Sequence, residues 1–185
     1  MKKIFCIVGR SASGKDSLVR EAKRNLGLKE LCSYTTRPPR FSGENTHIFT
    51  TEDRMIEHAH SGAIAAIARI GDWYYWSTIP QLYECDLYVI DYASLPQLKA
   101  LELADVEFVT IYVTAPAAER RKRALLRQPG CEDTYDMRVA AENEQFSQME
   151  EMKDWDYCIH NISFMEAYYQ FEQIIKTERT KINEI

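Results

Sequence analysis

The stretch G-R-S-A-S-G-K-D-S, residues 9–17, combines two glycines and a lysine in the spacing G-x-x-x-x-G-K, which is typical of loops that bind phosphate groups. The glycines let the backbone fold tightly, so that successive N–H groups point at anionic oxygens. Lys15 adds a full positive charge toward the β- and γ-phosphates of a nucleotide. We therefore predict that a nucleoside triphosphate contacts every residue of this stretch: Gly9, Arg10, Ser11, Ala12, Ser13, Gly14, Lys15, Asp16 and Ser17.

The residues on both sides of this loop are of the kind that it requires. Residues 4–8, I-F-C-I-V, form an apolar run that predicts a buried strand, and residues 18–26 predict a helix. A helix beginning at the loop adds the partial positive charge of its N-terminus to the same point. The order strand, loop, helix therefore favours a phosphate site over a plain turn.

The residue after the lysine departs from the usual pattern. Phosphate loops normally have Ser or Thr there, whose hydroxyl binds Mg²⁺, whereas this chain has Asp16 followed by Ser17. A carboxylate is also a hard oxygen ligand for Mg²⁺, although it adds negative charge near the triphosphate. Three arrangements are open: Asp16 binds the metal directly, binds it through water, or leaves it to Ser17.

A further candidate metal ligand ends an apolar stretch. Residues 86–91, D-L-Y-V-I-D, predict a buried strand with Asp91 at its C-terminal end. An acid at the carboxyl end of a parallel strand, beside a phosphate loop, is placed to order Mg²⁺. The alternative is that Asp91 caps a helix or a turn.

Two arginines predict a second anion site. Arg37 and Arg40 lie in T-T-R-P-P-R, residues 35–40, where the two prolines exclude a helix interior and stiffen an extended loop. Each guanidinium can grip a phosphate with two hydrogen bonds. The simpler reading is a solvated basic loop. In a chain with a phosphate loop, we favour a site for the acceptor of a phosphoryl group.

Composition argues against several classes of protein. The formal net charge of −5 argues against a general nucleic-acid-binding surface. The five cysteines are scattered without a C-x-x-C pair, which indicates neither a zinc site nor a disulfide framework. The chain shows no signal peptide and no apolar run long enough to span a membrane. We therefore expect a cytoplasmic enzyme with no membrane or nucleic-acid partner.

Predicted strands and helices alternate, with a β-rich segment inserted between them. Strands are expected at 4–8, 31–34, 47–50, 63–70, 73–78, 86–91, 107–113 and 156–159, and helices at 18–26, 51–60, 94–104, 117–127, 132–152 and 163–176. This order predicts an α/β protein whose parallel sheet is covered by helices on both faces, with an inserted lobe.

At this point the chain resembles the guanylate kinase family of P-loop nucleoside monophosphate kinases, over nearly its whole length. The resemblance rests on the phosphate loop, S-Y-T-T-R-P-P-R with G-E (residues 33–40 and 43–44), Y-Y-x-S-T (residues 74–78) and D-Y…N (residues 156–161). It implies a single domain, 1–185, with the three-layer α/β/α fold of P-loop NTPases. In this domain the core spans 1–31 and 84–185, an acceptor-binding lobe 32–83, and a helical lid about 119–140.

The family resemblance also assigns roles to side chains. It implies ATP as phosphoryl donor with Mg²⁺, and small-molecule substrates. Arg127 and Arg138, eleven positions apart, match two lid arginines that clamp the transferring group together with Lys15. Asn161 matches a position near the donor's adenine. The acceptor would be held by Ser33, Arg37, Arg40, Tyr75 and Ser77, together with His47, which replaces a family tyrosine.

The chain also departs from the family where guanine is recognised. The two acids that would accept hydrogen bonds from guanine N1–H and the 2-amino group correspond to Ala65 or Ala66 and to Ala93. Losing both acceptors weakens guanine selectivity unless Glu44, Asp72 or Arg69 has taken the role.

Two alternatives follow from these departures. G-K-D-S (residues 14–17) with E-N-x-H-I (residues 44–48) is also similar to ribose 1,5-bisphosphate phosphokinase, which phosphorylates a sugar phosphate without a base. A non-catalytic guanylate-kinase-like module that binds a protein is the third possibility, although the retained loop and lid arginines argue against it. We expect GMP or dGMP as the acceptor, with a ribose phosphate next.

Overall fold

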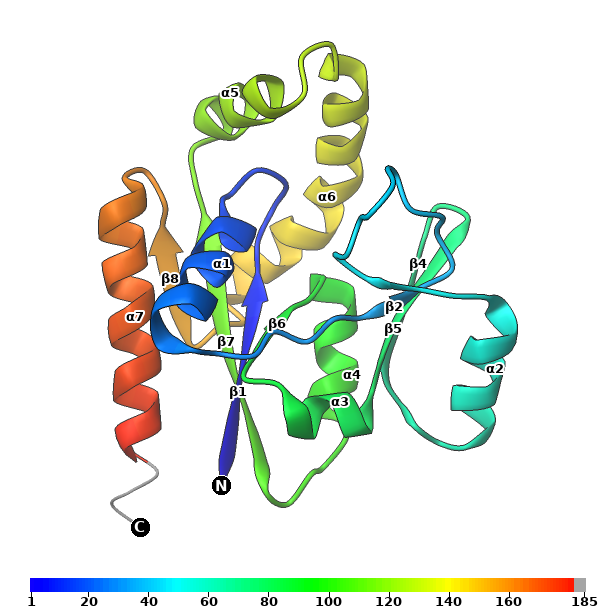
Figure 1. Ribbon diagram of the computed structural model, residues 1–185. Coiled ribbons are helices and arrows are strands. Elements are labelled where there is room, and N and C mark those ends of the chain that lie inside the picture. The colour runs from blue at the N-terminus through cyan, green and yellow to red at the C-terminus, as the bar shows by residue number, and fades with distance from the viewer. Residues whose placement is uncertain (182–185) are drawn as a thin grey trace.

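The first strand, β1 (Lys2–Val8), lies inside a four-stranded parallel sheet in the computed structural model of the protein, which describes residues 1–181 (Figure 1). The strand order is β6 (Leu87–Val89), β1, β7 (Val106–Thr114), β8 (Tyr157–His160). Phe5 pairs with Leu87 on one side and with Val109 on the other. The predicted apolar run at 4–8 is fully buried, because both of its faces are covered.

Helices cover both faces of this sheet. Phe5 and Ile7 of β1 point to one face, where α1 (Lys15–Leu26) and α7 (Phe164–Thr180) pack on them. Ile4, Cys6 and Val8 point to the other face, toward α4 (Leu95–Lys99) and the second half of α6 (Glu132–Met152). This alternation produces the predicted three-layer α/β/α architecture.

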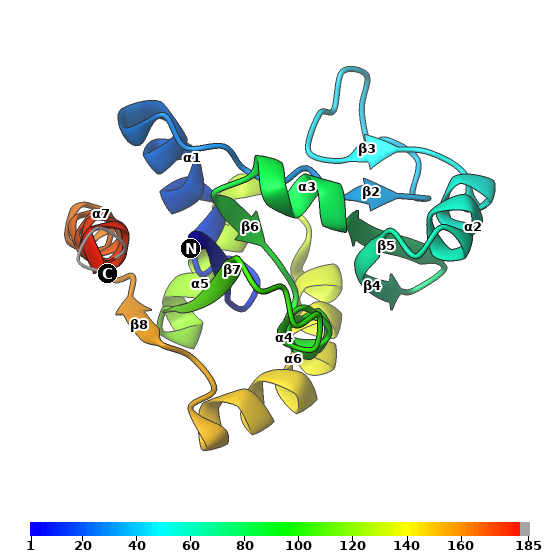
Figure 2. The same cartoon turned by 90° about the horizontal axis from the view of Figure 1, so that it is seen from below.

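A second sheet forms the lobe beside β6 (Figure 2). Its order is β3 (Ile48–Phe49), β2 (Tyr34–Thr35), β5 (Trp73–Thr78), β4 (Ile64–Ile70), and β4 and β5 form an antiparallel hairpin. Helix α2 (Glu52–His60) packs on this sheet where Trp76 Nε1 donates to His58 Nδ1 at 3.0 Å. The strands of the second sheet lie within the predicted lobe, 32–83.

Several element boundaries differ from the predicted ones. The helix expected at 94–104 is a 3₁₀ turn, η1 (Tyr92–Ser94), followed by the short α4, which ends at Lys99. A helix could not have continued to residue 104, because Glu102 adopts a positive φ of 46°. The sequence analysis missed helix α3 (Ile79–Glu84), although Thr78 and Gln81 form a capping box at its start. Helix α1 begins at Lys15 rather than at residue 18, immediately after the left-handed Gly14.

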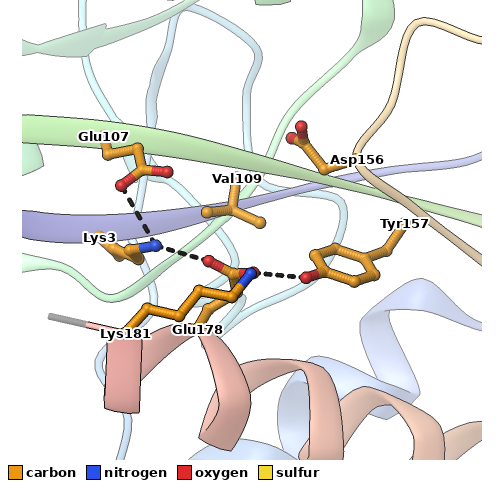
Figure 3. Close-up of a pocket in the computed structure, with 7 residues that line it drawn as sticks. All are labelled: Lys3, Glu107, Val109, Asp156, Tyr157, Glu178 and Lys181. Atoms are coloured by element: carbon orange, nitrogen blue, oxygen red, sulfur yellow. Dashed lines mark hydrogen bonds and ion pairs between the residues drawn. The ribbon is translucent and has the colours of Figure 1, made fainter. Parts of the chain in front are cut away.

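A charged network lies at the end of the sheet away from the phosphate loop (Figure 3). It lines a pocket of about 350 Å³ between β1, β7, β8 and α7. Glu178, only 4% exposed, accepts hydrogen bonds from Lys3, Lys181 and Tyr157, and Lys3 Nζ also lies 3.2 Å from a Glu107 oxygen. Because each lysine has a carboxylate partner, the charged side chains of this pocket connect β1 to the end of α7.

None of the helices within residues 1–181 combines the length and the apolar character needed to cross a membrane.

Candidate active site

The phosphate loop follows β1 and ends at α1, as the sequence predicts. Ala12 and Gly14 have positive φ values, 61° and 93°. A Cβ at Gly9 would lie 2.4 Å from the Val113 carbonyl oxygen, and one at Gly14 would lie 2.2 Å from Asn161 Nδ2. Both glycines are therefore required, the second for its conformation as well as its space.

Two side chains support the loop from behind. The Ser13 carbonyl accepts a hydrogen bond from Asn161 Nδ2 at 2.8 Å and a longer one from Arg123 Nη1 at 3.3 Å. Arg123 Nη2 also donates to the Asn161 carbonyl at 2.7 Å. Asn161 is only 2% exposed, so its amide is engaged with the loop backbone. Arg123 belongs to the basic run R-R-K-R-A-L-L-R, residues 120–127, and the sequence analysis did not identify it.

Arg10 turns its side chain away from the loop toward α6. Its guanidinium is bound by Glu150 at 3.0 and 3.1 Å and by Asn143 at 2.8 Å, and it lies over the Phe146 ring. These hydrogen bonds from Arg10 lower the pKa of Glu150. Because the guanidinium is already bound by α6, only the backbone of Arg10 can make the predicted contact with a nucleotide.

Ser11 is engaged by another residue of α6. Its N–H lies 3.0 Å from each carboxylate oxygen of Glu142, and its hydroxyl donates to the same carboxylate. The sequence analysis did not identify Glu142.

The start of α1 carries the lysine and two candidate metal ligands. Lys15 Nζ lies 3.6 Å from an Asp16 carboxylate oxygen, and the Asp16 side chain is 68% exposed. The Ser17 hydroxyl accepts a hydrogen bond from Arg20 at 3.3 Å. No cluster of three or more His, Cys, Asp or Glu side chains within residues 1–181 could hold a metal by itself. These oxygens fit Mg²⁺ that is shared with phosphate oxygens.

Asp91 caps the 3₁₀ turn η1. One carboxylate oxygen accepts from the Ser94 N–H at 3.0 Å and the other from the Ser94 hydroxyl at 2.7 Å. Asp91 therefore caps a turn, which is the alternative that the sequence left open. A role of Asp91 in binding Mg²⁺ stays a prediction.

The loop between β2 and β3 holds the predicted acceptor arginines. Glu44, 8% exposed, binds Arg37 through both oxygens at 2.9 and 3.3 Å and accepts from the Arg40 N–H at 2.6 Å. The Arg37 guanidinium also lies 5.3 Å from the centroid of the Phe49 ring. The hydrogen bond from Arg37, followed by that from Arg40, lowers the pKa of Glu44 to about 2. Glu44 is thus committed to the loop rather than free to recognise a base.

Next to Arg37 lie three more predicted acceptor residues. His47 Nδ1 is 3.0 Å from the Ser33 hydroxyl, and the His47 ring meets Tyr75 edge-on at 5.4 Å between centroids. Burial, followed by the charge of Arg37, lowers the pKa of His47, which keeps the ring neutral at pH 7. Ser77 differs, because it is fully buried and its hydroxyl has no hydrogen-bond partner within residues 1–181.

The strand expected to recognise the base is packed into the core. Ala65 and Ala66 of β4 are 4% and 1% exposed and belong to the same apolar cluster as Leu95 and Leu98. Gln97 binds both the N–H and the carbonyl of the next residue, Ile67, at 3.0 and 2.8 Å. Of the other candidate replacements, Arg69 lies over the Tyr74 ring, and Asp72 is exposed in the β4–β5 turn.

The residues predicted to form a lid, about 119–140, lie in α5 (Ala117–Arg127) and the first part of α6, beyond the end of the sheet where the phosphate loop lies (Figure 1). Arg127 ends α5, and Arg138 lies in the second turn of α6; both are exposed. Neither guanidinium has an ion pair or side-chain hydrogen bond among residues 1–181, in contrast to Arg120 and Arg123 of the same basic run.

Comparisons with known proteins agree with this architecture. The model of the guanylate kinase family, described as "Guanylate kinase", matches residues 1–178. A guanylate kinase of Thermotoga maritima is 29% identical over 188 residues, which cover 97% of this chain and 88% of the relative. One of Koribacter versatilis is 30% identical over 196 residues, covering 96% of this chain and 79% of the relative. The crystal structure of guanylate kinase from Anaplasma phagocytophilum superimposes with a TM-score of 0.65 at 19% identity, covering 96% of this chain and 86% of that one.

Proposed function

Because this chain belongs to the guanylate kinase family, we propose that it is a nucleoside monophosphate kinase that transfers the γ-phosphoryl group of ATP to GMP, releasing ADP and GDP. The observation that carries the proposal is the family match over residues 1–178, whose two ends include the phosphate loop and Asn161. Its substrates are small molecules. A cytoplasmic location is a prediction from the sequence.

On the donor side, Lys15 and the loop N–H groups hold the phosphates of ATP. Asp16, Ser17 and Asp91 are our candidates for holding Mg²⁺ or its bound waters. When bound, the ion neutralises the charge of the β- and γ-phosphates. Asp16 is exposed beside Lys15 and is therefore accessible to such an ion.

On the acceptor side, we place the acceptor phosphate beside Arg37, Arg40, His47 and Tyr75, and Ser33 orients His47. The proximity of His47 to Tyr75 and the shared partner Glu44 of Arg37 and the Arg40 N–H support this position. Buried Ser77 contacts the acceptor only if β5 or a neighbouring segment shifts. No general base is needed, because the acceptor phosphate is already an anion. Catalysis then depends on positioning, neutralisation of charge and exclusion of water.

The acceptor is tested by measuring kcat/KM with ATP and Mg²⁺ for GMP, dGMP, AMP, UMP and ribose 1,5-bisphosphate. We expect GMP or dGMP to rank first. The second candidate, a sugar phosphate, is favoured by the two buried alanines of β4, which offer no carboxylate to guanine. A GMP value no higher than that of AMP would overturn the guanylate kinase activity and leave a kinase of another acceptor. Transfer to none of the five would indicate a non-catalytic module.

The lid arginines give a second test of the chemistry. Arg127→Ala and Arg138→Ala should each lower kcat by about a thousandfold, because an arginine that contacts the transferring group stabilises its charge in the transition state. Arg121→Ala is the matched control, since Arg121 lies on α5 and forms only an exposed pair with Asp136. A kcat within about twofold of the unmodified enzyme would remove Arg127 or Arg138 from the mechanism.

A further inference from the structure

Glu142 of α6 occupies hydrogen-bond donors of the phosphate loop. Both of its carboxylate oxygens lie 3.0 Å from the Ser11 N–H, and one of them also accepts from the Ser11 hydroxyl. Ser11 lies between the two glycines of the loop, so these donors belong to the segment that the sequence predicts to contact phosphate. A carboxylate therefore satisfies donors that would otherwise face a ligand.

The rest of α6 fixes the helix in this position. Asn143, Phe146 and Glu150 lie on one side of α6 and hold Arg10, the neighbour of Ser11. Arg10 is only 7% exposed, whereas the side chain of its partner Glu150 is 40% exposed. Adjacent residues of α6 therefore bind adjacent residues of the loop: Asn143 binds Arg10, and Glu142 binds Ser11.

The chemistry of this contact is that of an anion in an anion site. Backbone N–H groups of a phosphate loop, together with the N-terminus of the following helix, favour negative charge. Hydrogen bonds from neutral donors to a charged acceptor are stronger than those between neutral groups. An incoming phosphate group must therefore displace Glu142 from Ser11, or bind a loop whose donors are partly used.

We propose that Glu142 is an internal anion of the donor site, which holds Ser11 when ATP is absent and leaves it when ATP binds. This inference rests on the proposed function only in requiring that the loop binds ATP. Release of Glu142 removes the polar contact between the loop and the first half of α6, which carries Arg138, and leaves the apolar packing of Tyr135 and Val139 near Ala12. The contact of Glu150 with Arg10 keeps the second half of α6 in place. Binding of the donor is thereby coupled to movement of the lid, at a cost in ATP affinity.

Calorimetric titration with ATP and Mg²⁺, without any acceptor, tests this proposal. Glu142→Gln removes the charge with almost no change in shape, and it should lower the Kd for ATP about tenfold, the effect of losing one charge-assisted competitor. Glu144→Gln is the matched control, because Glu144 is exposed on the same helix and has no side-chain hydrogen bond or ion pair within residues 1–181. Its Kd should equal that of the unmodified protein.

A folded Glu142→Gln protein with an unchanged or higher Kd for ATP would overturn the proposal. Thermal unfolding of each variant shows whether it is folded. If Glu142→Gln does not fold, Glu142→Asp replaces it, because the carboxylate is one methylene shorter and no longer reaches Ser11. This variant should also bind ATP several-fold more tightly. Since the titration contains no acceptor, it measures ATP binding whether or not the protein phosphorylates GMP. The two proposals can therefore fail separately.

Discussion

The phosphate loop and the loop between β2 and β3, which we propose to bind the donor and the acceptor, are each bound by a carboxylate, but the two carboxylates come from different places. Glu44 binds Arg37, which is seven residues away in the same loop, and it also accepts from the Arg40 N–H. Glu142 binds Ser11 from helix α6, 131 residues away in sequence. One carboxylate is thus part of the loop that it stabilises, and the other belongs to a separate element.

This difference assigns the two acids opposite tasks. Glu44 has a nearly buried side chain, and the hydrogen bond from Arg37 lowers its pKa to about 2, so it remains charged and in place at any pH near neutrality. It orients the arginine that we propose to bind the acceptor phosphate. Glu142 forms no ion pair within residues 1–181, and in our proposal it competes with the donor phosphate for Ser11. The same change, Glu to Gln, should therefore have opposite effects at the two sites.

Among changes within the two loops, the largest effect on ligand affinity is expected from Gly14→Ala, which distorts the phosphate loop alone. The new Cβ would lie 2.2 Å from Asn161 Nδ2 at a φ of 93°, so the loop must move away from its support. The affinity for ATP, measured by titration, should fall at least about a hundredfold. Acceptor binding should change little if the two loops are independent.

Gly27→Ala is the matched control for this change. Gly27 ends the same helix at a φ of 65°, but no atom lies within 4 Å of a Cβ placed there. It should reduce the free energy of unfolding by about 1 kcal/mol and leave ATP binding unchanged. An equal loss of ATP affinity in both variants would show that backbone strain, rather than the contact with Asn161, is responsible.

Glu44→Gln should have the next largest effect, and of opposite sign to Glu142→Gln. Glu44 accepts from Arg37 and from the Arg40 N–H with two carboxylate oxygens, whereas a glutamine amide has one oxygen and no charge. Arg37 would therefore lose its orientation. The KM for the acceptor should rise about thirtyfold, with the Kd for ATP unchanged. Glu57→Gln, which removes an exposed pair with Arg54 in the same lobe, should leave both values unchanged. A lower acceptor KM in Glu44→Gln would contradict the supporting role of Glu44.

The smallest effect on activity is expected from a third carboxylate, Glu178, which is far from both loops. Although burial alone would raise it, hydrogen bonds from Lys181, Lys3 and Tyr157 lower the pKa of Glu178 to about 2. Because the folded pKa lies below the ordinary value of about 4.3, the ionised form stabilises the fold above that pH. The free energy of unfolding should then decrease as the pH falls from about 5 toward 2.

Glu178→Gln should flatten part of this acid dependence, measured by denaturant unfolding at several pH values, and should lower stability at pH 7. Kinetic constants of the folded variant should stay within about twofold of the unmodified enzyme. The variant is therefore the reference for a purely structural acid. A slope identical to that of the unmodified protein would assign the acid dependence to Glu44 and other groups.

The sequence predicted the parts of the site that depend on short-range patterns. The phosphate loop, its two flanking elements and the loop of Arg37 and Arg40 can be identified from local sequence, because glycine and proline restrict or free the backbone where they stand. The capping box at Thr78 and Gln81 was equally local and could have revealed α3.

What could not be predicted depends on contacts between distant segments. Arg123 and Glu142 gain their roles only from the placement of α5 and α6 over the loop, and a basic run or an acidic helix face does not indicate such placement. Asp91 could not be assigned from the sequence either. An aspartate at the end of a strand is expected both for capping Ser94 and for binding Mg²⁺, so its position does not distinguish the two roles.

The central position of β1 has a consequence for how the protein is made. Its partners are β6 and β7, at Leu87–Val89 and Val106–Thr114, so β1 is synthesised before both partners and cannot pair until those segments have left the ribosome. Residues 4–8, fully buried at the end, are an exposed apolar segment during that interval. Parallel pairing over such separations is slow, so aggregation through this apolar segment competes with folding during synthesis.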